Sequence, residues 1–67
     1  MDVNFWKKQT RKFIKDVRFE LQLKQKDLAD ILDMPPGNIS AYETGRANPP
    51  GWVIVRLMEL LKEKTDE

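Results

Sequence analysis

The sequence predicts an all-α domain, a compact bundle of four to five helices. Apolar residues recur with helical spacing along nearly the whole chain, and no segment alternates in the way a strand does. Two neighbouring helical segments are short and are joined by a tight turn that contains proline. The 67 residues include no cysteine and no histidine. We therefore expect one domain held together by packing or by a partner subunit, without disulfides or the usual zinc ligands.

The spacing of apolar residues predicts a first helix from about Phe5 to Leu21. Asn4 is the expected N-cap, because its side chain can accept a hydrogen bond from a free backbone N–H. The residues on the shared face are Trp6, Thr10, Phe13, Ile14, Val17 and Leu21. We expect Trp6 and its neighbour Phe5 to pack in the core, whereas the lysines and arginines fall mostly on the opposite face.

Two shorter helices are expected next, at Gln25–Leu32 and at about Pro36–Glu43. Asp33 tolerates the left-handed conformation that ends many helices. Pro35 disfavours helix at the residue before it, and Pro36 suits the first turn of a new helix because its missing N–H has no partner there anyway. The core-facing residues of the two helices are Leu28, Ala29, Ile31, Leu32, Ile39 and Tyr42.

Gly45 is expected to end the third helix, since glycine adopts the left-handed conformation without strain. Residues 47–51, which read ANPPG, form a loop. A fourth helix is expected from about Gly51 to Lys62. Its apolar stripe consists of Ile54, Leu57, Met58 and Leu61.

The charges are unevenly distributed along the chain. Residues 1–26 carry a net charge of +5 and residues 27–67 a net charge of −4, so the whole chain carries only +1. Such a molecule can present a basic face to phosphates while staying nearly neutral overall. The alternative is a set of solvated helix faces joined by salt bridges.

The segment Lys24–Arg46 reads KQKDLADILDMPPGNISAYETGR and resembles the core motif of the Cro/cI-like family of helix-turn-helix proteins, the phage-repressor or xenobiotic-response-element type. The matching positions are Gln25, Leu28, Ala29, Leu32, Ile39, Ser40, Tyr42, Glu43, Gly45 and Pro49. The resemblance implies a lambda-repressor-like DNA-binding domain at residues 13–62, with the helix-turn-helix at about 25–44. Residues 1–12 are then a basic extension of the first helix, and residues 63–67 a charged tail.

The resemblance implies that the start of the third helix reads base edges in the major groove. These positions are Pro36, Gly37, Asn38 and Ala41, flanked by Ser40. Proline and glycine have no side chain that can make a base-specific hydrogen bond, so Asn38 is the one strong reader, for adenine. Ala41 and Pro36 are suited to touching a thymine methyl. Sparse readout of this kind predicts that DNA shape carries much of the specificity. Alternatively, Asn38 bonds the local backbone at the helix start.

The resemblance also implies contacts with the DNA backbone. Gln25, at the start of the second helix, suits a phosphate oxygen, and Lys26 beside it adds a charge. Thr44 and Arg46 follow the recognition helix and are expected near phosphates or the minor groove.

Arg18 and Glu43 occupy positions that form an ion pair in the family, linking the first helix to the third. In that interpretation Arg18 also faces the DNA backbone. The alternative is two unrelated surface charges.

Trp52, Val53 and Leu60 fall at positions that are often polar in the family. Exposed aromatic and aliphatic residues indicate a self-association surface, so we expect these three to form a dimer interface. The alternative is that Trp52 folds back and fills the core of a short domain.

The leading interpretation is a sequence-specific transcription regulator that binds double-stranded DNA, a phage or plasmid repressor of the Cro type acting as a homodimer. The alternative is a helix-turn-helix interaction module, such as an antitoxin, whose main partner is a protein. No enzyme activity, catalytic residue, metal or cofactor is expected. Asp27, Asp30 and Asp33 recur every three residues and are better explained as solvated helix-face acids than as metal ligands.

No apolar run approaches the roughly 18 to 20 residues that span a bilayer. The first residues also lack a basic segment followed by an apolar one, so no signal peptide is indicated. We therefore expect a cytoplasmic protein with no membrane partner.

Overall fold

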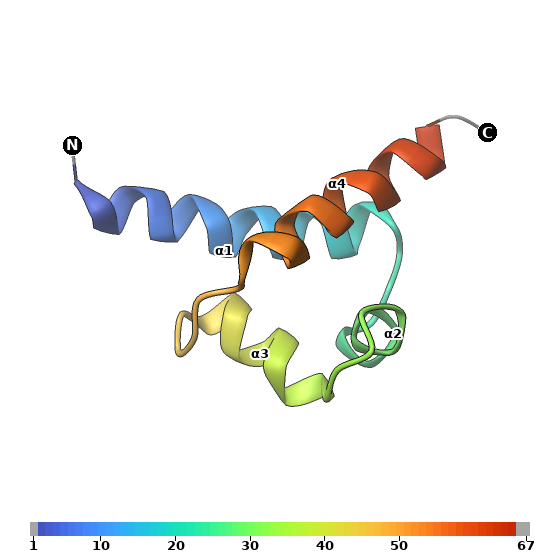
Figure 1. Cartoon of the computed structure of the whole chain (residues 1–67), viewed down its shortest axis with the longest axis horizontal. Helices are drawn as coiled ribbons and strands as arrows, with labels where there is room; N and C mark the ends of the chain where they lie inside the picture. The colour runs from blue at the N-terminus through green and yellow to red at the C-terminus, as the bar shows by residue number, and fades with distance from the viewer. Residues whose placement is uncertain (1, 66–67) are drawn as a thin grey trace.

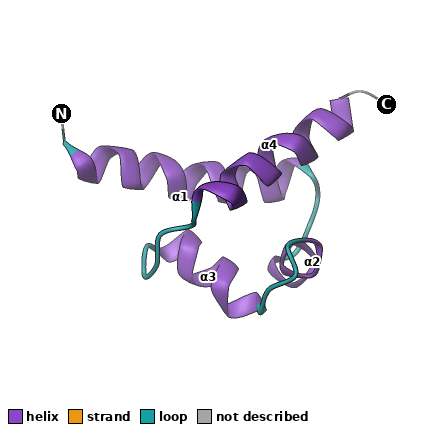
Figure 2. Ribbon diagram, viewed as in Figure 1, coloured by secondary structure: helices purple, strands orange, loops and turns teal. Residues whose placement is uncertain are grey.

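The computed structural model describes residues 2–65 and contains four helices within them: α1 (Val3–Glu20), α2 (Gln25–Ile31), α3 (Pro36–Thr44) and α4 (Gly51–Thr65). Figure 1 shows α1 and α4 side by side, with α2 and α3 below them. Loops connect the helices, and residues 2–65 contain no strand (Figure 2). The predicted all-α fold is confirmed.

Both long helices extend beyond their expected bounds. α1 starts at Val3 because Asp2, rather than Asn4, is the N-cap: its carboxylate accepts a hydrogen bond of 2.9 Å from the Asn4 backbone N–H. α4 continues past Lys62, so residues 63–65 of the expected tail are helical. Residues 66–67 of that tail lie outside the described part of the chain. No helix within residues 2–65 is long and apolar enough to cross a membrane.

The first three helices end in the same hydrogen-bonded closure. A left-handed residue follows each helix, and the next N–H bonds back to a carbonyl five residues earlier, which is the Schellman pattern. The left-handed residues are Gln22, Asp33 and Gly45, with φ of 58°, 56° and 83°. The bonds, donor first, run from Leu23 to Arg18, from Met34 to Ala29 and from Arg46 to Ala41, at 3.0, 3.0 and 2.9 Å. These closures fix the direction in which the chain leaves each helix.

The core lies where α1, α2, α3 and α4 meet. Its fully or nearly fully buried residues are Ile14, Val17, Leu28, Ala29, Leu32, Ile39, Tyr42, Val53 and Leu57. The buried part of α1 begins only at Ile14, since the first turns of this helix project beyond the body of the molecule (Figure 1). The expectation that Phe5 and Trp6 pack in the core is therefore wrong, because about half of each side chain is exposed.

The orientation of α4 also differs from the predicted one. Val53 is fully buried, so its assignment to a dimer interface is wrong, whereas Met58 of the expected core stripe is 58% exposed. Ile54 and Leu61 are half-buried. The cause is that α4 is apolar on nearly every side, so spacing alone does not select the face that meets the core.

Candidate nucleic-acid interface

α3 presents its first turn to solvent and its opposite face to the core. Ile39 is fully buried and Tyr42 is 7% exposed, whereas Pro36, Gly37 and Asn38 are all exposed. Pro36 takes the first helical position, as predicted, and the extended residue Pro35 caps the helix start. The expected base-reading positions thus lie together at an open helix start.

The side chain of Asn38 is available for an outside partner. The Asn38 backbone N–H donates to the carbonyl of Pro35 at 3.0 Å, so the helix start is closed without the side-chain amide. Within residues 2–65 the Asn38 amide makes no hydrogen bond. Ser40 and Ala41 are half-buried beside it.

The start of α2 lies next to α3 and carries exposed cations. Lys24 and Lys26 are exposed, and the Lys24 backbone N–H donates to the Asp27 carboxylate at 3.0 Å, which caps the helix. Gln25 is half-buried, and its Nε2 donates to Glu43 Oε1 at 3.3 Å. Gln25 therefore contacts α3 directly, with one of its two amide hydrogens still free to donate elsewhere.

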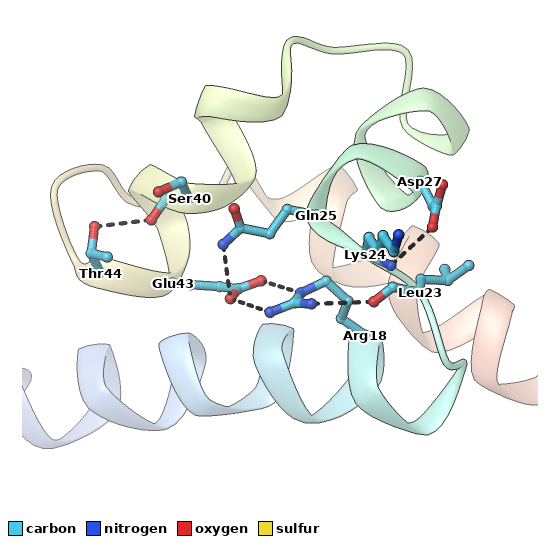
Figure 3. A network of polar contacts seen from close by, with 8 residues as sticks. All are labelled: Arg18, Leu23, Lys24, Gln25, Asp27, Ser40, Glu43 and Thr44. Carbon is cyan, nitrogen blue, oxygen red and sulfur yellow. Dashed lines mark hydrogen bonds and ion pairs between the residues drawn. The ribbon is translucent and has the colours of Figure 1, made fainter.

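An ion pair between Arg18 and Glu43 joins α1 to α3 (Figure 3). Arg18 Nε donates to Glu43 Oε2 at 2.8 Å and Nη2 donates to Oε1 at 2.9 Å, a two-bond geometry that fixes both side chains. Nη1 donates to the carbonyl of Leu23 at 3.2 Å, at the closed end of α1. The side chains of Arg18 and Glu43 are only 12% and 5% exposed. Arg18 thus holds α1, α3 and the turn before α2 in place.

The environment of this pair keeps both groups charged. Burial is the largest influence on Glu43 and opposes its ionisation, but hydrogen bonds from Arg18 and Gln25 and the charges of Arg18 and Lys15 outweigh it, so the pKa of Glu43 is lowered. The hydrogen bond to Glu43 raises the pKa of Arg18 against the opposing effect of burial. The carboxylate is therefore a stable acceptor at the centre of the helix junction.

Two arginines lie at the C-terminal end of α3. Arg46 folds back along the helix, donating from Nε to Thr44 Oγ1 at 3.2 Å and from Nη2 to Ser40 Oγ at 3.3 Å. Arg11 of α1 lies against Gly45, where an added Cβ would be 2.6 Å from the Arg11 Cζ. The partial negative charge at the C-terminal end of a helix attracts cations in this position.

Arg11, together with Lys7 and Lys15, is not among the site residues predicted from the sequence. Lys7 and Arg11 line a hollow with residues 47–49, and the charge of Lys15 acts on Glu43. Their signal was present in the spacing: positions 7, 11, 15 and 18 follow one stripe of a helix. The buried Arg18 at the end of that stripe showed which way it faces.

The remaining expected site residues lie elsewhere. Trp52 is 55% exposed on α4, and Leu60 lines a separate hollow with Leu21–Leu23 and Ile31. Among residues 2–65 no three carboxylates gather in an arrangement that can hold a metal ion.

A short helix whose first turn is exposed, packed against the short helix that precedes it, is the arrangement of a helix-turn-helix DNA-binding domain. A family model described as helix-turn-helix matches residues 14–67. The chain belongs to this family, which is the Cro/cI type, and the resemblance predicted from its motif is confirmed. It is a DNA-binding regulator from a family of regulators rather than of enzymes. No curated protein and no solved structure matches the chain.

Proposed function

We propose that the protein is a repressor of the phage or plasmid Cro type that binds a specific operator in double-stranded DNA as a homodimer. The observation that carries this proposal is the exposed start of α3 on a helix whose other face is locked by Ile39, Tyr42 and Glu43. A helix held in this way can enter the major groove with its first turn leading.

In this proposal Asn38 is the main base-reading side chain. Its free amide pairs with the N6 and N7 atoms of an adenine, while Pro36 and Ala41 contact thymine methyl groups. Gly37 has no side chain to contribute. Few direct contacts remain, so the sequence-dependent shape of the duplex supplies much of the discrimination.

The backbone contacts proposed come from the start of α2 and from the residues at the C-terminal end of α3. Gln25 and Lys26 contact one strand at the start of α2, and Thr44 and Arg46 contact phosphates after α3. Arg18 contributes by holding α3 in place and, through its remaining N–H groups, by facing the backbone. Ser40 orients Arg46, to which it is hydrogen-bonded at 3.3 Å.

The dimer proposal rests on the exposed side of α4. Trp52, Val55 and Met58 are each more than half exposed and follow one another at intervals of three residues. Apolar surface of this kind marks interaction sites in small proteins. Two copies on adjacent half-sites would bind far more tightly than one, since the second contact becomes intramolecular.

Selection of bound sequences from a random pool of duplexes tests this function. We expect a two-fold symmetric consensus. On that consensus, Asn38→Ala should weaken binding about five- to 150-fold, because one good bidentate base contact contributes roughly 1–3 kcal/mol. Gln9→Ala, which removes an exposed amide from α1, is the matched control and should bind as the wild type does. Failure of the pool to enrich any sequence would contradict the proposal.

A second candidate function is that of a protein-interaction module such as an antitoxin. It is favoured by an apolar groove between α1 and α4 lined by Trp6, Phe13, Ile54 and Met58, together with Gln9 and Thr10. This candidate predicts weak DNA binding even at about 50 mM salt, whereas phosphate contacts give a steep dependence on salt concentration.

A further inference from the structure

The charged residues of α1 from Lys7 onward follow two stripes of the helix, and one of these stripes is entirely basic. Lys7, Arg11, Lys15 and Arg18 are separated by four, four and three residues, which places them on one stripe. The acids lie on another side: Asp16 and Glu20 line a hollow with Leu61 of α4, and Glu20 pairs with Lys64. That second stripe is mixed, because Lys12 pairs with Asp16, so only the stripe from Lys7 to Arg18 is free of acids.

The basic stripe faces α3 and the loop that follows it. Arg18 is bonded to Glu43, Arg11 lies against Gly45, and Lys7 lies with Arg11 beside residues 47–49. The stripe is thus continuous with the C-terminal end of α3, which is followed by the exposed Arg46.

Three cations of this stripe have no ion pair within the described part of the chain. Among residues 2–65 Arg18 is paired with Glu43 and Lys12 with Asp16, but Lys7, Arg11 and Lys15 pair with no carboxylate. Lys15 acts on Glu43 only through its charge and lies over the Phe19 ring at 5.8 Å, so none of the three is held by a direct bond to a carboxylate and each can bind an anion outside the protein. From Lys7 to Lys15 the helix rises by about 12 Å, a length over which one DNA strand presents roughly three to four phosphates.

We propose that Lys7, Arg11 and Lys15 form a phosphate clamp that binds the DNA backbone beside the stretch contacted by α3. Lys7 and Arg11 precede the family match, which begins at residue 14, so this contact belongs to the extended α1 of this chain. The clamp deepens the proposed function and rests on it. It adds affinity for any duplex sequence, because phosphates carry no base identity.

The test compares two triple variants that lose the same charge. Lys7→Gln, Arg11→Gln and Lys15→Gln together remove the clamp, whereas Lys12→Gln, Lys62→Gln and Lys64→Gln remove three cations outside it. Kd for a mixed-sequence duplex about two helical turns long is measured between about 50 and 200 mM KCl. Each phosphate contact contributes about 0.9 to the slope of log K against log salt. The clamp variant should therefore lose about two to three from the slope, while the control keeps the wild-type slope.

Loss of folding is separated from loss of contact by a milder variant. Arg11 touches Gly45, but Lys7 and Lys15 are exposed, so Lys7→Gln with Lys15→Gln leaves the helix junction intact. This double variant should melt as the wild type does in circular dichroism and still lose about 1.8 from the slope.

The outcomes separate the clamp from the wider proposal. A clamp variant that keeps the slope of its matched control, while Arg46→Gln reduces it, overturns the clamp and leaves DNA binding through α3 standing. A wild-type chain that binds no duplex overturns both.

Discussion

The α2–α3 pair and the α1–α4 pair bury their apolar residues to very different degrees. In α2 and α3, Leu28, Ala29 and Ile39 are fully buried, and Ile31 is the large aliphatic side chain left 43% exposed among the residues of these two helices. In α1 and α4, seven large apolar side chains are about half exposed or more: Val3, Phe5, Trp6, Phe19, Trp52, Val55 and Met58. The difference indicates that the α2–α3 pair leaves little apolar surface uncovered once packed against the long helices, whereas α1 and α4 keep apolar surface outside the shared core.

The largest effect on the free energy of unfolding should come from Ile39→Ala, a buried residue of the α2–α3 pair. Removing this buried side chain should cost about 3–4 kcal/mol, a large part of the roughly 3–10 kcal/mol that a domain of this size has. Ile31→Ala in the same unit should cost less than about 1 kcal/mol. Urea unfolding followed by circular dichroism measures both. Equal losses in the free energy of unfolding would show that burial does not determine the cost at these two positions.

Arg18→Ala should come next, because it leaves the Glu43 carboxylate buried with Gln25 as its remaining side-chain donor. We expect a loss of about 2–3 kcal/mol, since an uncompensated charge at a helix junction is costly. Lys12→Ala breaks an exposed ion pair on the same helix and should cost less than about 1 kcal/mol. Thermal unfolding distinguishes the two, and similar melting temperatures would contradict the structural role of Arg18.

Two neighbouring residues of α4, one buried and one exposed, test the same contrast in the α1–α4 pair. Val53→Ala should destabilise the fold by about 2 kcal/mol, because the valine is fully buried. Trp52→Ser should change monomer stability by about 0.5 kcal/mol or less, and instead weaken self-association. Sedimentation equilibrium over a range of protein concentrations checks the second effect. A destabilised monomer with unchanged association would place Trp52 in the core.

The pH dependence of stability should differ between wild type and Glu43→Gln. The pKa of Glu43 is lowered in the folded chain, so its ion pair stabilises fully above the ordinary glutamate value of about 4.3. That contribution is lost as the pH falls through the lower folded value. Stability of the wild type should therefore fall more steeply below about pH 5 than that of Glu43→Gln. Parallel curves in acid titrations would show that Glu43 does not contribute.

Changes at the helix ends should have smaller effects on stability than loss of Ile39, Arg18 or Val53. Gln22→Gly should stabilise by about 1 kcal/mol, because a side chain at positive φ is strained and glycine is not. Gly45→Ala should do the reverse, since its Cβ would also collide with Arg11. Melting temperatures that move in the same direction in both variants would contradict the closure described for these ends.

Local rules made the α2–α3 unit predictable from sequence. Asp33 and Gly45 mark helix ends and Pro36 marks a helix start, each through a restriction on its own backbone. Gln22 was missed because glutamine has no preference for positive φ. Its conformation is imposed by the next residue, Leu23, which packs against the core and bonds to the Arg18 carbonyl.

The placement of the long helices depended on contacts between distant residues. α4 carries apolar side chains on nearly every side, so only its packing against α1 selects Val53 and Leu57 for the core. The basic stripe of α1 was readable as a charge imbalance, but its direction became clear only from Arg18, Glu43 and Gly45. Motif spacing thus located the reading helix, while the surroundings of the site required three-dimensional contacts.

The closed helix ends have a mechanical consequence. Backbone hydrogen bonds close the ends of α1, α2 and α3, and an ion pair joins α1 to α3, so a change in the angles between these helices would break several bonds. When a stiff body meets a duplex, any mismatch in curvature falls on the more compliant of the two, and the bending energy of the duplex depends on its base steps. In the proposed complex, a rigid protein would therefore favour duplexes whose base steps bend readily.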